Sequence, residues 1–178
     1  MINNLVSFLS SWADDPLGML HFLLALLALI VGPAIFLTRK GTQIHRFSGY
    51  IYTSSMVLLN VSALFMYQLT GGFNLFHFFA IMSLATIVPA FWSIRKGIVT
   101  GEKKYYYRHA HFMAWSYYGL MMAGISETIT RQFPQILPAA GDWSAFLLFL
   151  AVLLPVSAYF TFSLVNSTVP RVYGEHVS

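Results

Sequence analysis

The sequence predicts an all-α integral membrane protein with five transmembrane helices. Four of them are expected to form a bundle from a duplicated two-helix hairpin, and the fifth is peripheral. Of the 178 residues, 57% are hydrophobic and only 9% are charged, whereas soluble domains carry about 25% charged residues. Five apolar runs are each close to the roughly 20 residues that cross a bilayer. In addition, the segment 21–41 recurs in the same register as 77–97.

The chain begins with a segment, 1–16, that we expect to lie at the membrane interface. It has a short apolar stretch but lacks the basic start of a signal peptide. The five apolar runs then lie at about 17–37, 47–69, 74–94, 110–130 and 143–165. The second and fourth runs are the more polar, which is typical of helices that face a bundle interior. The absence of cysteine excludes disulfides, thiolate metal sites and iron–sulfur clusters.

The repeat has a constant offset of 56 residues. The matched residues are His21, Phe22, Pro33, Ala34, Arg39, Lys40 and Gly41, which recur as His77, Phe78, Pro89, Ala90, Arg95, Lys96 and Gly97. Shared membrane composition does not produce such a match, so we interpret it as a duplication of a hairpin, 17–69 and 74–131. Both hairpins cross in the same direction, which predicts a pseudo-two-fold axis along the membrane normal and one four-helix bundle over 17–131. Residues 132–178 then supply a loop, the peripheral fifth helix and a tail.

The basic residues predict the orientation of the chain. Nine of the ten lie between the first and second runs, between the third and fourth, or after the fifth: Arg39, Lys40, Arg46, Arg95, Lys96, Lys103, Lys104, Arg108 and Arg171. Only Arg131 falls on the other side. The positive-inside rule places the nine in the cytoplasm, so we expect five crossings of a bacterial inner membrane with the N-terminus outside and the C-terminus inside. The basic residues flank apolar runs without forming a groove, which argues against nucleic-acid binding.

Five of the six histidines fall at helix ends, in two layers. His21 and His77 lie near the outer ends of the first and third helices, and the repeat makes them equivalent. His45 begins the second helix at the inner side, and His109 and His111 begin the fourth. The last two point roughly 200° apart and cannot both face the core. The match between the residues after His45 and those after His111 favours His111.

The two layers predict two facing pairs, His21 with His77 and His45 with His111. Neutral imidazoles on separate helices can supply both axial ligands of a haem iron. Without a C-x-x-C-H motif such a haem is non-covalent. The competing interpretation is that each histidine is an interfacial anchor or a helix cap, as we expect for His176 in the polar tail.

A zinc or non-haem iron site is the alternative. Glu127 together with His21 and His77 would give two histidines and a carboxylate with an open position. Glu127 also stands four residues before Arg131, and we favour this local ion pair. At the inner side, a three-histidine site would use His45, His109 and His111.

Two resemblances bear on function. The pattern His45-Arg46-x-x-Gly49-x-x-Tyr52 after a first membrane helix resembles a family of predicted bacterial membrane proteins, a domain of unknown function, over roughly residues 17–131. That resemblance implies a membrane protein and no activity. The alternating histidine layout resembles the transmembrane dihaem cytochromes b of the ascorbate-reducing and ferric-reductase kind. This implies haem b on His21, His77, His45 and His111, with electron transfer between the two faces. The chain departs from those proteins in having no flavin or nicotinamide domain.

Three functions follow as hypotheses. The first is a small b-type cytochrome, or the membrane subunit of a redox complex, with a quinone or a redox protein as partner. The second is a metal-dependent membrane enzyme. The third is a cofactor-free accessory protein whose histidines are anchors. The electron donor and acceptor, the substrate and the oligomeric state do not follow from the sequence.

Overall fold

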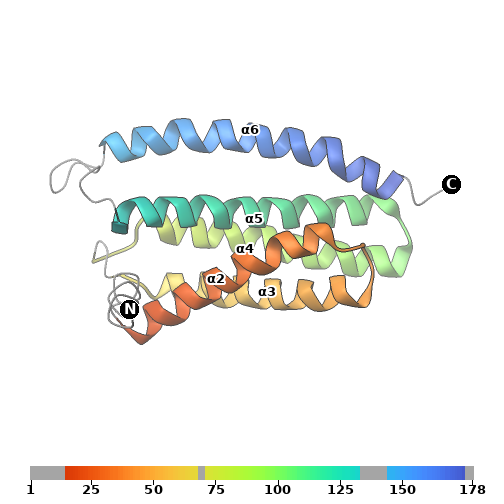
Figure 1. Cartoon of the computed structure of the whole chain (residues 1–178), viewed down its shortest axis with the longest axis horizontal. Coiled ribbons are helices and arrows are strands. Elements are labelled where there is room, and N and C mark those ends of the chain that lie inside the picture. The colour runs from red at the N-terminus through yellow and green to blue at the C-terminus, as the bar shows by residue number, and fades with distance from the viewer. Residues whose placement is uncertain (1–14, 68–70, 133–143, 175–178) are drawn as a thin grey trace, which may run out of the picture. The chain divides into compact units, whose positions relative to one another are not determined.

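The computed structural model describes residues 15–67, 71–132 and 144–174, and the regular structure in these ranges is entirely helical (Figure 1). The helices are α2 (Pro16–Leu37), α3 (Gln43–Leu64), α4 (Leu75–Thr100), α5 (Lys103–Gln132) and α6 (Ser144–Gly174). The all-α class and the order of five helices are therefore confirmed. The interfacial segment predicted at 1–16 lies outside the described residues, except for its last two.

Judged by length and composition, three of the described helices could cross a membrane. They are α2, α4 and the part of α6 at 147–167. α3 and α5 have 22 and 30 residues, so they are long enough, but they carry more polar side chains. The crossings predicted for α3 and α5 stay a prediction.

The chain divides into two compact units, one up to Leu84 and one from Ala85, so the boundary falls inside α4. In the first unit α2 and α3 lie side by side, and in the second unit α5 and α6 do (Figure 1). The four-helix bundle and the hairpin boundaries at 17–69 and 74–131 stay predictions.

The ends of α2 are determined by its sequence. Asp15 is the N-cap, and its carboxylate accepts a hydrogen bond of 2.6 Å from the Gly18 N–H. Pro16 follows at the first helical position, where its missing N–H costs nothing. At the other end the Lys40 ammonium donates to two carbonyls of the last turn, at 2.8 and 2.9 Å. These bonds satisfy carbonyls that have no partner within the helix.

The two copies of the repeat share a local interaction. Lys40 lies 5.9 Å from the centroid of the Phe36 ring, and the equivalent Lys96 lies 4.8 Å from that of Trp92. Both are cation–π pairs spaced four residues apart. The same register therefore produces the same contact in each unit, which agrees with a duplication.

The second copy differs in where its helix stops. Gly41 has φ 78° and forms the turn after α2, whereas its equivalent Gly97 is helical and Gly101 takes the positive φ, at 70°. The end of α2 is equivalent to position 93, but α4 continues to Thr100. Gly97 also allows α5 to approach closely, because a Cβ there would lie 3.2 Å from the Cβ of Tyr105.

Candidate functional site

His21 contacts the neighbouring helix through its side chain. Its Nδ1 lies 3.0 Å from the Ser62 hydroxyl of α3. That hydroxyl donates its single hydrogen to the Leu59 carbonyl, at 2.7 Å. The Ser62 oxygen must therefore accept from His21, so His21 carries a proton on Nδ1.

His77 has a different role, although the repeat makes it equivalent to His21. It is the third residue of α4, and Asn74 precedes that helix. The Asn74 side chain accepts from the Phe76 N–H at 3.0 Å, and the Asn74 N–H donates to His77 Nδ1 at 3.2 Å. This is a capping box in which histidine replaces the usual Glu or Gln. Since Nδ1 accepts, the neutral ring carries its proton on Nε2.

The rest of the His77 ring is enclosed. The side chain is 1% exposed, and the rings of Tyr67 and Phe73 lie with centroids 4.8 and 5.1 Å from it. Its Nε2 is buried and has no hydrogen-bond partner in the described part of the chain. A buried donor without an acceptor costs about 1–3 kcal/mol. We refer to His77, Tyr67, Phe73 and Asn74 as the His77 site.

Asn60 joins α3 to the first part of α4 within the same unit. The residue is 6% exposed, and its amide nitrogen donates to the Met56 carbonyl at 2.6 Å and to the Ser83 hydroxyl at 2.9 Å. Both amide hydrogens are thus used. The bond between His21 and Ser62 joins α3 to α2, and the bond between Asn60 and Ser83 joins α3 to α4.

In the second unit, His111 bonds through both ring nitrogens. Its Nδ1 donates to the Tyr107 carbonyl at 2.9 Å, and its Nε2 lies 2.9 Å from the side-chain oxygen Oδ1 of Asn166 in α6. The residue therefore links α5 to α6. No nitrogen of the ring is left open for an iron or zinc ion.

His109 points to a different helix. Its Nδ1 donates to the Ala90 carbonyl of α4 at 3.0 Å, which leaves the lone pair on Nε2. Metal-binding histidines usually have this second hydrogen bond. His109 precedes the crossing predicted at 110–130, and burial lowers its pKa, while the bond to Ala90 acts in the opposite direction. The ring is therefore neutral at pH 7.

The remaining candidates are His45, Glu127 and His176. His45 lies in the first turn of α3, where its backbone N–H donates to the Thr42 hydroxyl. It belongs to the first unit and His111 to the second, so their pairing stays a prediction. Glu127 lies in α5, but the side chain of Arg131 is outside the described residues, as is His176. Within the described ranges no group of three or more His, Asp and Glu is placed to hold a metal ion.

Sequence reasoning missed Ser62, Asn74 and Asn166, which bond to histidines, and Asn60, which joins α3 to α4. One of them had a readable signal. Asn74 followed three residues later by a polar side chain, just before an apolar run, is the pattern of a capping box. The other three depend on which turn of a neighbouring helix lies opposite, and no local pattern encodes that.

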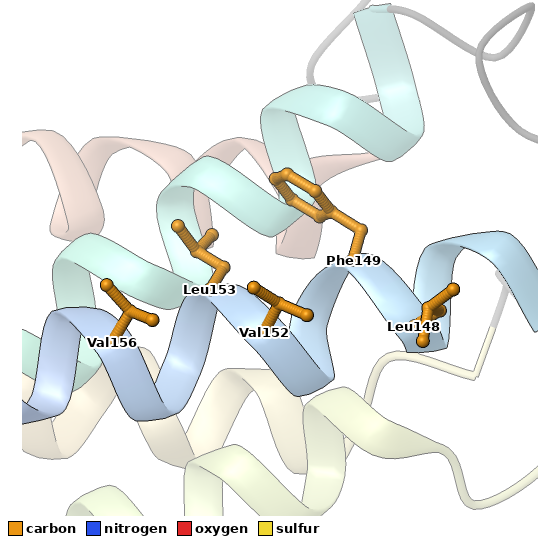
Figure 2. Close-up of a pocket in the computed structure, with 5 residues that line it drawn as sticks. All are labelled: Leu148, Phe149, Val152, Leu153 and Val156. Carbon is orange, nitrogen blue, oxygen red and sulfur yellow. The ribbon is translucent and has the colours of Figure 1, made fainter.

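A shallow depression on α6 offers no comparable chemistry. It has a volume of about 450 Å³ and is lined by Leu148, Phe149, Val152, Leu153 and Val156. Figure 2 shows that all five side chains come from the one helix. Every lining group is apolar, as expected for a helix face that contacts lipid chains.

A family model described as "Predicted membrane protein (DUF2306)" matches residues 18–166. No curated protein and no solved structure matches the chain.

Proposed function

The chain belongs to this family of predicted membrane proteins, and from that premise we propose that it is a quinone-binding membrane component of an electron-transfer system. The observation that carries the proposal is the His77 site. There a ring N–H is buried between two aromatic side chains with no acceptor in the described part of the chain.

The chemistry of the site selects the ligand class. The buried ring N–H of His77 is a donor without an acceptor in the described part of the chain, so the ligand must supply an acceptor. A charged acceptor would be costly to bury here, whereas a neutral carbonyl oxygen would not. Tyr67 and Phe73 favour a flat ring beside the imidazole. A quinone meets these requirements, because it is a flat ring that carries carbonyl oxygens and dissolves in lipid.

The residues of the site would hold and orient the ligand. His77 donates its Nε2–H to one carbonyl, and the capping box fixes the ring because Nδ1 is held by the Asn74 N–H. The rings of Tyr67 and Phe73 exclude water from that hydrogen bond, which strengthens it.

The test is direct binding to the whole protein. We expect the purified protein in lipid nanodiscs to bind a short-chain quinone at about one per chain, and a non-quinone hydrocarbon of similar size to bind far more weakly. Equal binding of both compounds would contradict the proposal, as would no saturable binding of the quinone.

The tautomer of His109 favours haem as a second candidate. Its ring donates from Nδ1 and keeps a lone pair on Nε2, the atom that ligates iron. His77 and His111 do not fit as they stand, because each would have to give up a hydrogen bond to become a ligand. Haem would supply a one-electron centre. A Soret band in purified protein that is lost in His109→Ala supports this candidate, and a colourless protein removes it.

We also propose five crossings of the bacterial inner membrane, with the N-terminus outside. The proposal for α3 is supported by its length, which equals that of α2, and by its packing against α2. Reporter fusions after Gly41, Gly72 and Gly101 should then read inside, outside and inside, as the basic residues require. An external reading after Gly101 would refute the orientation.

A further inference from the structure

The turn between α4 and α5 concentrates positive charge. We define the α4–α5 turn as residues 92–108. It contains five basic residues and one acid: Arg95, Lys96, Lys103, Lys104, Arg108 and Glu102. This stretch therefore carries a net charge of +4, equal to that of the whole chain.

Three of the cations gather around two aromatic rings. The Lys96 ammonium lies 4.8 Å from the centroid of Trp92 and 4.9 Å from that of Tyr105. Lys104 lies 5.1 Å from Tyr105, and Arg108 lies 5.8 Å from Trp92. The two rings themselves meet edge to face at 5.9 Å. Cation–π attraction thus holds like charges together that would otherwise separate.

The backbone of the turn is well defined. Tyr105 is 5% exposed and packs closely against Gly97, where a Cβ would lie 3.2 Å from the Cβ of Tyr105. Gly101 takes φ 70° and donates its N–H to the Gly97 carbonyl at 2.8 Å. The aromatic rings are therefore positioned by a packed turn, and the cations are positioned by the rings.

The charges are only partly balanced. Glu102 pairs with Lys104, and that hydrogen bond and charge raise the pKa of Lys104. Within the described residues no carboxylate is paired with Lys96 or Arg108. The turn therefore has two positioned cations that an anion can neutralise.

We propose that the α4–α5 turn binds the phosphate of an anionic phospholipid headgroup. α4 is apolar and long enough to cross a membrane, which places its end at the level of the headgroups. Trp92 is 50% exposed beside the cations, and tryptophan prefers this interface. Basic clusters next to a membrane helix attract anionic lipid. The lipid also contacts the indole with its glycerol and acyl chains, which a free phosphate ion does not.

The experiment compares two double variants of equal charge. Lys96→Gln with Arg108→Gln removes the unpaired cations at the rings, whereas Arg95→Gln with Lys103→Gln removes two exposed cations outside the ring cluster. Phosphatidylglycerol is titrated into the detergent-solubilised full-length protein and its retention is measured by native mass spectrometry. We expect the first double variant to bind phosphatidylglycerol about tenfold more weakly or worse. The reason is that each Lys or Arg at the membrane surface adds to the attraction for anionic lipid. The second should change binding by less than about threefold.

Several results would overturn the proposal. Equal weakening in both double variants would mean that diffuse charge, and not this site, attracts the lipid. Inorganic phosphate alone that displaces the lipid at millimolar concentration would identify the ligand as the free ion.

Thermal melting in phosphatidylcholine nanodiscs checks folding. If the first double variant melts early, the exposed single change Arg108→Gln should still weaken binding about threefold or more, and unchanged binding there would overturn the proposal.

Discussion

Replacing His77 by glutamine should abolish quinone binding and leave the melting temperature of the protein close to that of the wild type. Glutamine is a natural residue at the third position of a capping box, so its carbonyl can accept the Asn74 N–H in place of Nδ1. What glutamine cannot reproduce is an N–H that points away from the cap, between the rings of Tyr67 and Phe73. The measurements are a quinone titration and a thermal melt of the same nanodisc sample.

The matched control is Asn74→Ala, which should behave in the opposite way. It removes the side-chain acceptor for the Phe76 N–H but keeps the backbone bond to His77. Loss of such a cap costs about 1 kcal/mol, so the melting temperature should fall while the quinone still binds. If both variants lose stability and ligand together, His77 is only a helix cap. If His77→Gln still binds the quinone, the proposed donor is wrong.

The difference between His21 and His77 shows where the sequence stops being informative. The repeat predicts equivalent positions, and the local pair of Lys40 with Phe36 recurs as Lys96 with Trp92. The start of α2 corresponds to position 72, but α4 starts only at Leu75. His77 therefore falls in the first turn, where backbone N–H groups lack partners, and it becomes a cap.

The helices were predictable for a simple physical reason. Long apolar runs with few breaking residues have to satisfy their backbone groups internally, and a helix does so. The rule that residues two apart point in opposite directions also holds, because His109 bonds to α4 and His111 to α6. Which of them keeps a free lone pair was not predictable. That depends on Asn166, which is 55 residues away in sequence.

Replacing Asn60 by aspartate should be the most destabilising of the polar substitutions in the first unit. The change keeps the shape but removes both donors and places a carboxylate against the Met56 carbonyl and the Ser83 hydroxyl. A charge at the centre of a membrane helix costs about 2.5–3.5 kcal/mol, and the cost here should be smaller because Asn60 lies near the end of α3. Asn60→Leu removes the same hydrogen bonds without adding a charge and should cost less.

A double-mutant cycle of Asn60→Leu with Ser83→Ala isolates the bond between α3 and α4. Interhelical hydrogen bonds in membranes average about 0.6 kcal/mol and reach about 1.7 kcal/mol, so the coupling should fall in that range. Unfolding in mixed micelles with increasing denaturing detergent measures all four proteins and Asn60→Asp. A coupling near zero would mean that the bond does not hold the two helices together. If the aspartate variant is as stable as the leucine variant, water reaches position 60. The burial of Asn60 between α3 and α4 would then be wrong.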